Sequence, residues 1–163
     1  MDKSTILMTM PGELRLDAHG RWVHDLQPVT HPGIADYLSK HLCWNDLHGR
    51  FVVEVEGRAV PVIIDDTAYF VVALDTSAVP WQIALNDGSS AEPLVGPIEV
   101  RASGEFICRV KGGRFPAKFG RNVHQQLQPF IEATGTSGNR YAVRTRTEEI
   151  QLVCQTKPTG NAD

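Results

Sequence analysis

The chain has 163 residues, of which 42% are hydrophobic and 21% are charged, and its formal net charge at pH 7 is −3. This length suits one ordinary domain or two small halves that share a core, and the acidic balance argues against nonspecific nucleic-acid binding. The charge is uneven, because residues 1–80 carry 11 acidic and 6 basic side chains whereas residues 81–163 carry 8 and 10.

The cysteines predict a reducing compartment. Cys43, Cys108 and Cys154 are widely spaced, odd in number and flanked by apolar residues, which is untypical of a disulfide framework. The apolar run near the start of the chain is too short for a signal peptide, and no segment approaches the roughly 18 apolar residues of a membrane span. We therefore expect a cytoplasmic bacterial protein without a membrane partner.

The first half of the chain predicts strands around one helix. Residues 12–24 alternate apolar and polar side chains on both sides of a His-Gly turn, which is typical of a hairpin. Residues 30–44 change to helical spacing, with Pro32 in the expected first turn. Residues 50–66 predict a second hairpin around Glu-Gly, and residues 67–75 predict a strand that is buried on both faces.

The second half repeats the order of the sequence patterns in the first half, and we interpret it as an internal repeat. Residues 75–97 contain a short apolar run and a strong turn signal, which predict a connecting segment. The matched residues are Leu14 with Ile98, Gly20 with Gly104, Trp22 with Phe106, Pro32 with Pro116, Arg50 with Arg140, and Val60 with Ile150. Their spacing is 84 residues before the second expected helix and 90 after it, which predicts a longer loop after that helix.

The second expected helix begins at Pro116 and places Phe119, Val123 and Leu127 on one face. Pro129 removes a helical hydrogen bond, so this helix is expected to kink or stop near Gln128.

These patterns predict an α+β fold of two similar strand-strand-helix-strand-strand halves, with mostly antiparallel sheets packed on two helices. The expected organisation is a first repeat at 12–74, a connecting segment at 75–97, a second repeat at 98–153 and a mobile tail at 154–163.

The stretch from Leu14 to Asp25 resembles the opening of the bacterial DUF1285 family, Leu-x-Ile/Leu-Asp-x-x-Gly-x-Trp-x-His-Asp-Gly. Leu26 departs from the final glycine of that pattern. Further similarities to family segments extend the resemblance to about residue 153 and are carried by Asp66, Gly113, Ala117 and Arg121. The resemblance implies an α+β fold with repeated halves and a role in sensing or signalling. It brings no established catalytic activity and no active site.

The residue patterns give little support to metal binding or catalysis. Five histidines lie between His19 and His48, but they lack HExxH, HxH or CxxC spacing, so we expect no metal and no cofactor. His24 and Asp25 are neighbours on one expected strand and project to opposite faces, so they cannot form a dyad with each other. A GxSxG motif is absent, and apolar neighbours predict that Cys108 is inert.

The basic run at residues 109–121 is the most specific charge feature, because it holds five basic side chains and no acid. It is either a solvated face or an anion site, in which Gly112 and Gly113 would precede a helix start and offer backbone N–H groups.

The function that these features favour is a noncatalytic sensor module that holds a small anionic or nucleotide-like ligand between the halves and acts by population shift. The candidate ligand-binding residues are Trp22, His24, Asp66, Arg109, Arg114 and Arg121. One alternative is a protein-interaction module with a protein partner or a second copy of the chain. Another is a small enzyme that uses His24 and Asp66 as an acid–base pair.

Overall fold

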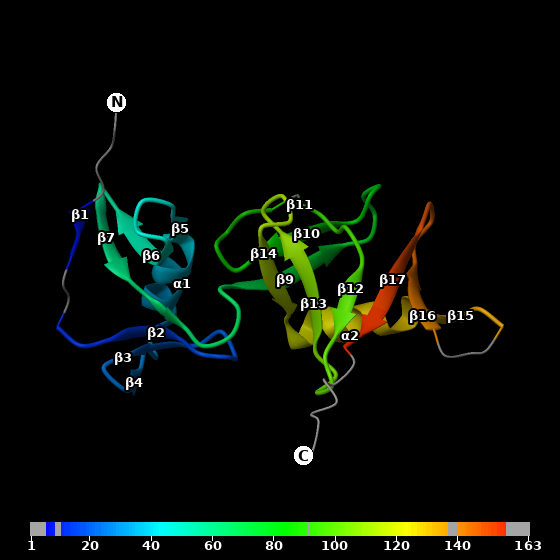
Figure 1. The fold of residues 1–163 in the computed structure, drawn as a ribbon, viewed down its shortest axis with the longest axis horizontal. Helices are drawn as coiled ribbons and strands as arrows, with labels where there is room; N and C mark the ends of the chain where they lie inside the picture. Colours follow the sequence, from blue (N-terminus) through cyan, green and yellow to red (C-terminus); the bar gives the residue numbers. More distant parts are fainter. Residues whose placement is uncertain (1–5, 9–10, 91, 137–139, 156–163) are drawn as a thin grey trace, which may run out of the picture. The chain divides into compact units, whose positions relative to one another are not determined.

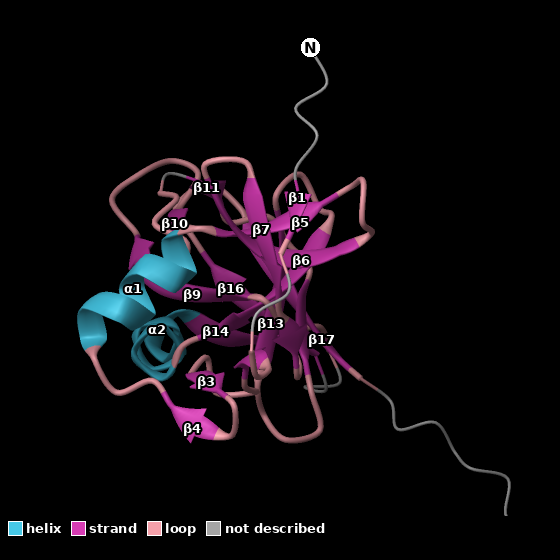
Figure 2. Cartoon of the chain, turned by 90° about the vertical axis from the view of Figure 1, so that its left-hand side faces the viewer, coloured by secondary structure: helices cyan, strands magenta, loops and turns pink. Residues whose placement is uncertain are grey.

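The computed structural model describes residues 6–8, 11–90, 92–136 and 140–155. The chain divides into two compact units. The N-terminal unit comprises the chain up to Phe70 together with residues 86–89, and the C-terminal unit comprises residues 71–85 and the chain from Ser90 onwards. The coarse α+β prediction is confirmed, with a larger share of strand than of helix (Figure 2).

The described residues of the N-terminal unit form one helix and two small sheets (Figure 1). Its elements are β1 (Ile6–Leu7), β2 (Leu14–Leu16), β3 (Trp22–His24), β4 (Gln27–Pro28), α1 (Pro32–Lys40), β5 (Leu42–Asn45), β6 (Arg50–Val55), β7 (Arg58–Pro61) and β8 (Ile63–Ile64). Among the described residues, one sheet has the order β1-β7-β6-β5 and the other β4-β3-β2-β8. The expected hairpins are present as β2–β3 and β6–β7, and β8 returns parallel to β2.

The C-terminal unit is built on one larger sheet. Its elements are β9 (Tyr69–Asp75), which starts in the N-terminal unit, β10 (Gln82–Leu85), β11 (Glu92–Pro93), β12 (Ile98–Val100), β13 (Phe106–Val110), β14 (Phe115–Phe119), α2 (Arg121–Leu127), the 3₁₀ turn η1 (Gln128–Phe130), β15 (Ile131–Thr134), β16 (Arg140–Arg144) and β17 (Glu149–Cys154). In the described part of the chain these strands form a sheet of order β11-β10-β9-β14-β13-β12-β17-β16-β15. Residues 75–97, expected to connect two repeats, thus supply β10 and β11 to this sheet.

The first predicted helix is present but shorter than expected. It begins at Pro32, where the Nδ1 atom of His31 accepts hydrogen bonds from the backbone N–H groups of Gly33 and Ile34. Leu42 belongs to strand β5 and not to the helix, because it pairs with Val53 on β6. None of the residues of α1 is buried, so the expectation that sheets pack on this helix finds no support in its burial.

The second helix does not begin at Pro116. Residues 115–119 form strand β14, in which Pro116 pairs with Arg109. Apolar residues at 115, 117 and 119 recur at a period of two, which is the spacing of a strand, so Phe119 belongs to β14. The buried residues of α2 are therefore Val123 and Leu127 alone. The stop that Pro129 predicts is confirmed, because α2 ends at Leu127 and a 3₁₀ turn follows.

The extra length that the expected repeat places after the second helix lies in a hairpin instead. In the β3–β4 hairpin, the paired residues His24 and Gln27 enclose a two-residue turn. In the β13–β14 hairpin, the paired residues Cys108 and Ala117 enclose a segment that is about six residues longer. The additional residues therefore extend this hairpin and do not follow the helix. Of the expected mobile tail, Cys154 ends β17, and residues 156–163 lie outside the described residues.

Candidate functional site

Trp22 is a core residue of the N-terminal unit. Its side chain is buried, and the indole Nε1–H donates a hydrogen bond of 2.8 Å to the Oγ atom of Ser39 on α1. This bond satisfies the polar end of a large apolar side chain and ties β3 to the helix. Trp22 is thus occupied within its own unit and offers no open surface to a ligand.

His24 and Asp66 lie in the same unit. His24 is half-buried on β3, opposite Leu14, and its Nε2 atom donates to the carbonyl oxygen of Pro11 at 2.9 Å. Asp66 is half-buried in the segment after β8 and has polar interactions of its own. The hydrogen bond of His24 gives this residue a structural role between the hairpin and the segment that precedes β2.

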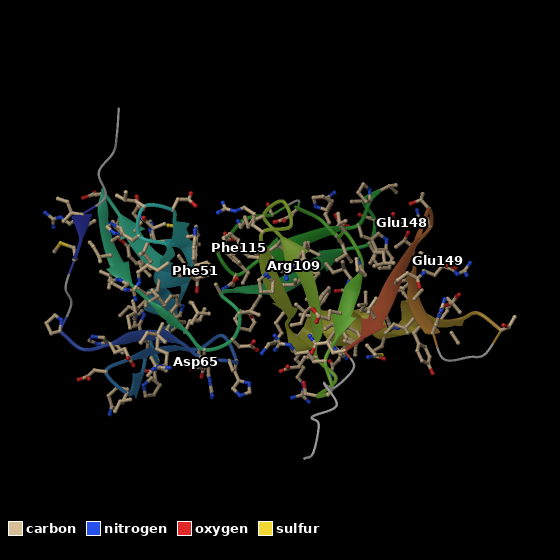
Figure 3. The ribbon with its side chains drawn as sticks, in the orientation of Figure 1. Phe51, Asp65, Arg109, Phe115, Glu148 and Glu149 are labelled. Atoms are coloured by element: carbon tan, nitrogen blue, oxygen red, sulfur yellow. The ribbon has the colours of Figure 1, made fainter. Side chains whose placement is uncertain are left out.

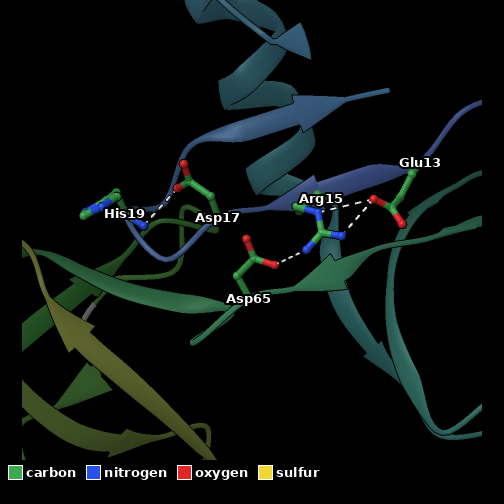
Figure 4. Close-up of polar contacts among 5 residues, drawn as sticks. All are labelled: Glu13, Arg15, Asp17, His19 and Asp65. Carbon is green, nitrogen blue, oxygen red and sulfur yellow. Dashed lines mark hydrogen bonds and ion pairs between the residues drawn. The ribbon is translucent and has the colours of Figure 1, made fainter. Parts of the chain in front are cut away.

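The polar cluster that stands out in this unit uses a different acid. Arg15 on β2 forms ion pairs with Glu13 and with Asp65, and Asp65 follows β8 (Figure 4). Both hydrogen bonds raise the pKa of Arg15, the bond with Glu13 more than the bond with Asp65. Because β2 and β8 are parallel neighbours, the cluster fastens together two strands that are far apart in the sequence.

The β2–β3 hairpin and the β12–β13 hairpin each have an ion pair across the turn, with the positions of acid and base exchanged. In the β2–β3 turn, Asp17 accepts from the backbone N–H of His19 at 2.9 Å (Figure 4) and pairs with the Nε atom of Arg21 at 3.0 Å. In the β12–β13 turn, Arg101 pairs with Glu105 at 3.4 Å. Both are pairs four residues apart, with acid and base exchanged.

Glu105 has a second cationic partner, the nearly buried Lys118 on β14, whose Nζ lies 3.3 Å from the carboxylate. Burial alone would raise the pKa of Glu105, but the hydrogen bond from Ser103 and the charge of Lys118 outweigh it, so this pKa is lowered. A lowered pKa in the folded state stabilises the fold above the ordinary value near 4.5, and this contribution disappears as the pH falls through the folded pKa.

Glu105→Gln is therefore expected to lower the free energy of unfolding by about 1 kcal/mol at pH 7 and by less below pH ~4, since the pair is partly exposed. Urea unfolding at a series of pH values measures this difference. Glu148→Gln is the control, because Glu148 is exposed. Equal stability loss at every pH would contradict an electrostatic role for Glu105.

A cleft of about 810 Å³ lies in the C-terminal unit. Its lining residues lie on β12, β13 and β17 and around β11. In the sheet, β12 lies between β13 and β17 (Figure 1). Its lining residues are Glu92, Pro93, Val95, Gly96, Pro97, Glu99, Ile107, Cys108, Arg109, Lys111, Gly112, Gly113, Val153 and Gln155. The extended part of the β13–β14 hairpin thus forms one of its walls.

Strand register places four of these side chains on one face of the sheet. Glu99 on β12 pairs with Ile107 on β13 and with Val153 on β17. Arg109 lies two residues beyond Ile107 on β13 (Figure 3). Paired residues, and residues two apart on a strand, project to the same side, so Glu99, Ile107, Arg109 and Val153 share the face that the cleft covers.

The charged groups of the cleft differ in their hydrogen-bond partners. Glu92 accepts a hydrogen bond from the backbone N–H of Lys111, which joins the β11 segment to the hairpin turn. Glu99 accepts a hydrogen bond from the side-chain amide of Gln155. Arg109 is exposed, and within the described residues its guanidinium has no hydrogen bond, ion pair or ring contact. It is thus a cation that a ligand can reach.

The other two candidate arginines do not line this cleft. The guanidinium of Arg114 lies over the ring of Phe115, 5.1 Å from its centroid. Arg121 is exposed at the first position of α2, after the extended residue Gly120. Gly112 and Gly113 form the hairpin turn, both with positive φ, so the prediction that they precede a helix start is wrong. The structure therefore brings only Arg109 of the three arginines to the cleft.

Cys108 belongs to the lining of the cleft, but its side chain is buried and projects to the face of β13 opposite to Ile107 and Arg109. Its burial, and secondly the charge of Glu92, raise the pKa of the Cys108 thiol to about 12. The thiol is therefore protonated at neutral pH, as its apolar neighbours predict. In the described part of the chain, no group of three or more His, Cys, Asp or Glu side chains is placed to hold a metal ion. No described helix is both long enough and apolar enough to cross a membrane.

Sequence reasoning missed Glu99 and Val153. They are far apart along the chain and meet through the parallel pairing of β12 with β17. The only local signal was the alternation around Glu99, which indicates a strand but not its neighbour.

Comparisons with known proteins bear on the fold. Neither the scan against protein-family models nor the search among curated proteins gives a match. Two solved structures are similar. A DUF1285 family protein from Silicibacter pomeroyi DSS-3 superposes with a TM-score of 0.61 at 16% identity, covering 86% of this chain and 79% of its own. A DUF1285 family protein from Shewanella baltica OS155 superposes with a TM-score of 0.53 at 12% identity, covering 72% and 91%.

Proposed function

We propose that this chain, which has a DUF1285-like fold, is a noncatalytic module that binds a small anionic ligand in the cleft of its C-terminal unit. The observation that carries the proposal is the guanidinium of Arg109, which has no partner among the described residues and lies in a cleft whose two carboxylates already have donors. We assign the module to sensing in the bacterial cytoplasm, in keeping with its three free cysteines.

The cleft has the properties of a ligand site. A volume of about 810 Å³ lies within the usual range for small-molecule pockets, which combine apolar walls with a few polar groups. Arginine can donate two parallel hydrogen bonds to one carboxylate or phosphate, which fixes the orientation of the bound anion as well as its position.

The chemistry of the lining favours binding over catalysis. The described lining residues include no histidine, serine or threonine, and the Cys108 thiol is protonated. An arginine stays charged at all working pH values and cannot serve as a general base. The two carboxylates, Glu92 and Glu99, hold the hairpin turn and Gln155 by hydrogen bonds.

We also infer that the two units arose by duplication of one ancestral unit. In β2–β3, Leu16 pairs with Trp22, and in β12–β13, Val100 pairs with Phe106, so the same register recurs 84 residues later. The turn between these strands has the same backbone hydrogen bond in both units. The N–H of Gly20 donates to the carbonyl oxygen of Asp17, and the N–H of Gly104 donates to that of Arg101.

The closing strands support the same inference. Arg15 on β2 pairs with Ile63 in parallel, and Glu99 on β12 pairs in parallel with Val153. The position of Glu99 is thus that of Arg15, whose side chain is engaged by Asp65 in the N-terminal unit. The longer β13–β14 hairpin lines the cleft of the C-terminal unit, so the binding site would be a later specialisation of one copy.

A protein-interaction module is the second candidate, and helix α1 favours it. Ile34 and Tyr37 lie about one turn apart on α1 and are 52% and 49% exposed. Apolar side chains that share an uncovered helix face can dock a partner. This candidate requires no ligand in the cleft.

A thermal-shift screen of the full chain against inorganic phosphate, nucleotides and carboxylates tests the proposal. A ligand at about 100 times its dissociation constant adds roughly 2.7 kcal/mol of stability, which is a shift of several degrees. Arg109→Gln is expected to weaken the affinity of any hit about 10- to 100-fold, because it removes a charge-assisted hydrogen bond.

Arg121→Gln is the matched control, since it removes the same charge from an exposed site outside the cleft. Its affinity should equal that of the unaltered chain. If no compound raises the melting temperature, or if Arg109→Gln binds the hits with unchanged affinity, small-anion binding at this site is overturned. Self-association measured by light scattering would then favour the α1 surface.

A further inference from the structure

We propose that the ligand of the cleft is a monocarboxylate with an elongated apolar body, of the medium-chain fatty acid class. This inference rests on the proposed function, because it names the ligand of the same cleft. It departs from the nucleotide-like ligand that the sequence suggests, and it rests on the charges, the apolar lining and the strand geometry of the cleft.

The charges of the lining favour a single negative charge on the ligand. Arg109 and Lys111 are balanced by Glu92 and Glu99, so the formal charge of the lining is zero. Of these four charged groups, only the guanidinium of Arg109 has no partner among the described residues. A single carboxylate can pair with it, whereas the further charges of a nucleotide di- or triphosphate would meet the two glutamates in a partly dehydrated space, where repulsion is stronger than in water.

The rest of the lining is apolar and partly uncovered. Ile107 forms the floor between Arg109 and Glu99 on the shared face, and it is buried. Val95 and Val153 line the cleft and are 60% and 49% exposed. An apolar ligand body would cover these two side chains and remove their surface from water, which is the main source of affinity for such ligands.

The strand order sets the direction and the length of that body. Arg109 lies on β13 and Val153 on β17, with β12 between them. Two strand spacings amount to roughly 10 Å, and Arg109 stands two residues, roughly 7 Å, further along β13 than Ile107. A ligand whose carboxylate binds Arg109 can therefore extend its body over Ile107 and past Glu99 to Val153. This span of roughly 12 Å suits the Arg109 side chain together with a chain such as that of octanoate.

Isothermal titration calorimetry of the full chain with butanoate, hexanoate and octanoate tests the inference, with octanamide, AMP and ATP as comparison ligands. Each buried CH₂ group is expected to tighten binding about three- to fourfold, so octanoate should bind roughly 100-fold more tightly than butanoate. Octanamide has the same body without the charge, and it should bind at least tenfold more weakly than octanoate.

Two variants test the charged groups of the cleft. Arg109→Gln should remove the preference for octanoate over octanamide while the variant keeps its melting temperature, since Arg109 is exposed. Glu99→Gln should strengthen AMP binding more than octanoate binding, because the negative charge that it removes repels a dianion more strongly than a monocarboxylate. Arg121→Gln should change neither.

The outcomes separate this inference from the proposed function. Tight binding of AMP or ATP that depends on Arg109, with no response to octanoate, would overturn the monocarboxylate and leave the anion-binding cleft in place. Equal affinity for octanoate and octanamide would overturn the role of the charge. The absence of binding by every ligand would overturn both proposals. A preference for octanoate over octanamide that persists in Arg109→Gln would place the carboxylate elsewhere and also overturn the inference.

Discussion

Leu127→Ala is expected to lower the free energy of unfolding of the C-terminal unit by about 2–5 kcal/mol. Leu127 is 0% exposed and, with Val123, is one of the two buried residues of α2. Truncation removes the apolar surface that fixes this helix to the sheet and leaves a cavity that the surrounding strands can fill only in part. Urea unfolding followed by circular dichroism measures the loss.

Ile34→Ala is the matched control on the other helix. Ile34 occupies the apolar side of α1 but is 52% exposed, so its truncation should change stability by less than about 0.5 kcal/mol. Similar losses for both variants would mean that α1 is packed as deeply as α2. A negligible loss for Leu127→Ala would contradict the buried position of this residue.

The two helices show what the sequence can and cannot predict. Helical spacing at residues 30–44 predicts α1 and its apolar side, and in the structure His31 caps this helix. The same pattern also predicts a buried helix, because periodicity records which side is apolar and not whether anything covers it. At Phe119 the residue spacing fits a helix and a strand equally well, and the pairing of β14 with β13 decides for the strand.

The cleft shows the same limit for function. Charge alone selects Arg109, Arg114 and Arg121 equally, because all three stand in one basic run. Only the folded arrangement distinguishes Arg109, which lies in the cleft without a partner among the residues that the structure describes, from Arg114, which lies over an aromatic ring. Val153 enters the site through the parallel pairing of β12 with β17, a long-range contact that no local pattern encodes. Sequence reasoning therefore finds the hairpins and the basic run that contains Arg109, but not the apolar surface beside this residue.

Trp22→Ala is expected to lower the free energy of unfolding of the N-terminal unit by about 3–5 kcal/mol. Trp22 is buried, so truncation opens a large cavity between β3 and α1 and removes the donor to the Ser39 hydroxyl. A residue that lined an open ligand site would behave differently, because its truncation would weaken binding and leave stability nearly unchanged. Urea unfolding thus decides between the core role of Trp22 and the ligand-binding role that the sequence suggests.

Two milder variants separate packing from hydrogen bonding at the same place. Trp22→Phe keeps an aromatic ring but loses the indole N–H, and Ser39→Ala keeps the indole but removes its acceptor. Each is expected to lower stability by about 1–2 kcal/mol, and the double variant should lose less than the sum because both remove the same bond. Strict additivity would mean that the bond contributes nothing and that Trp22 stabilises the unit through its volume alone. A stable Trp22→Ala variant would instead remove Trp22 from the core and return it to the set of candidate binding residues.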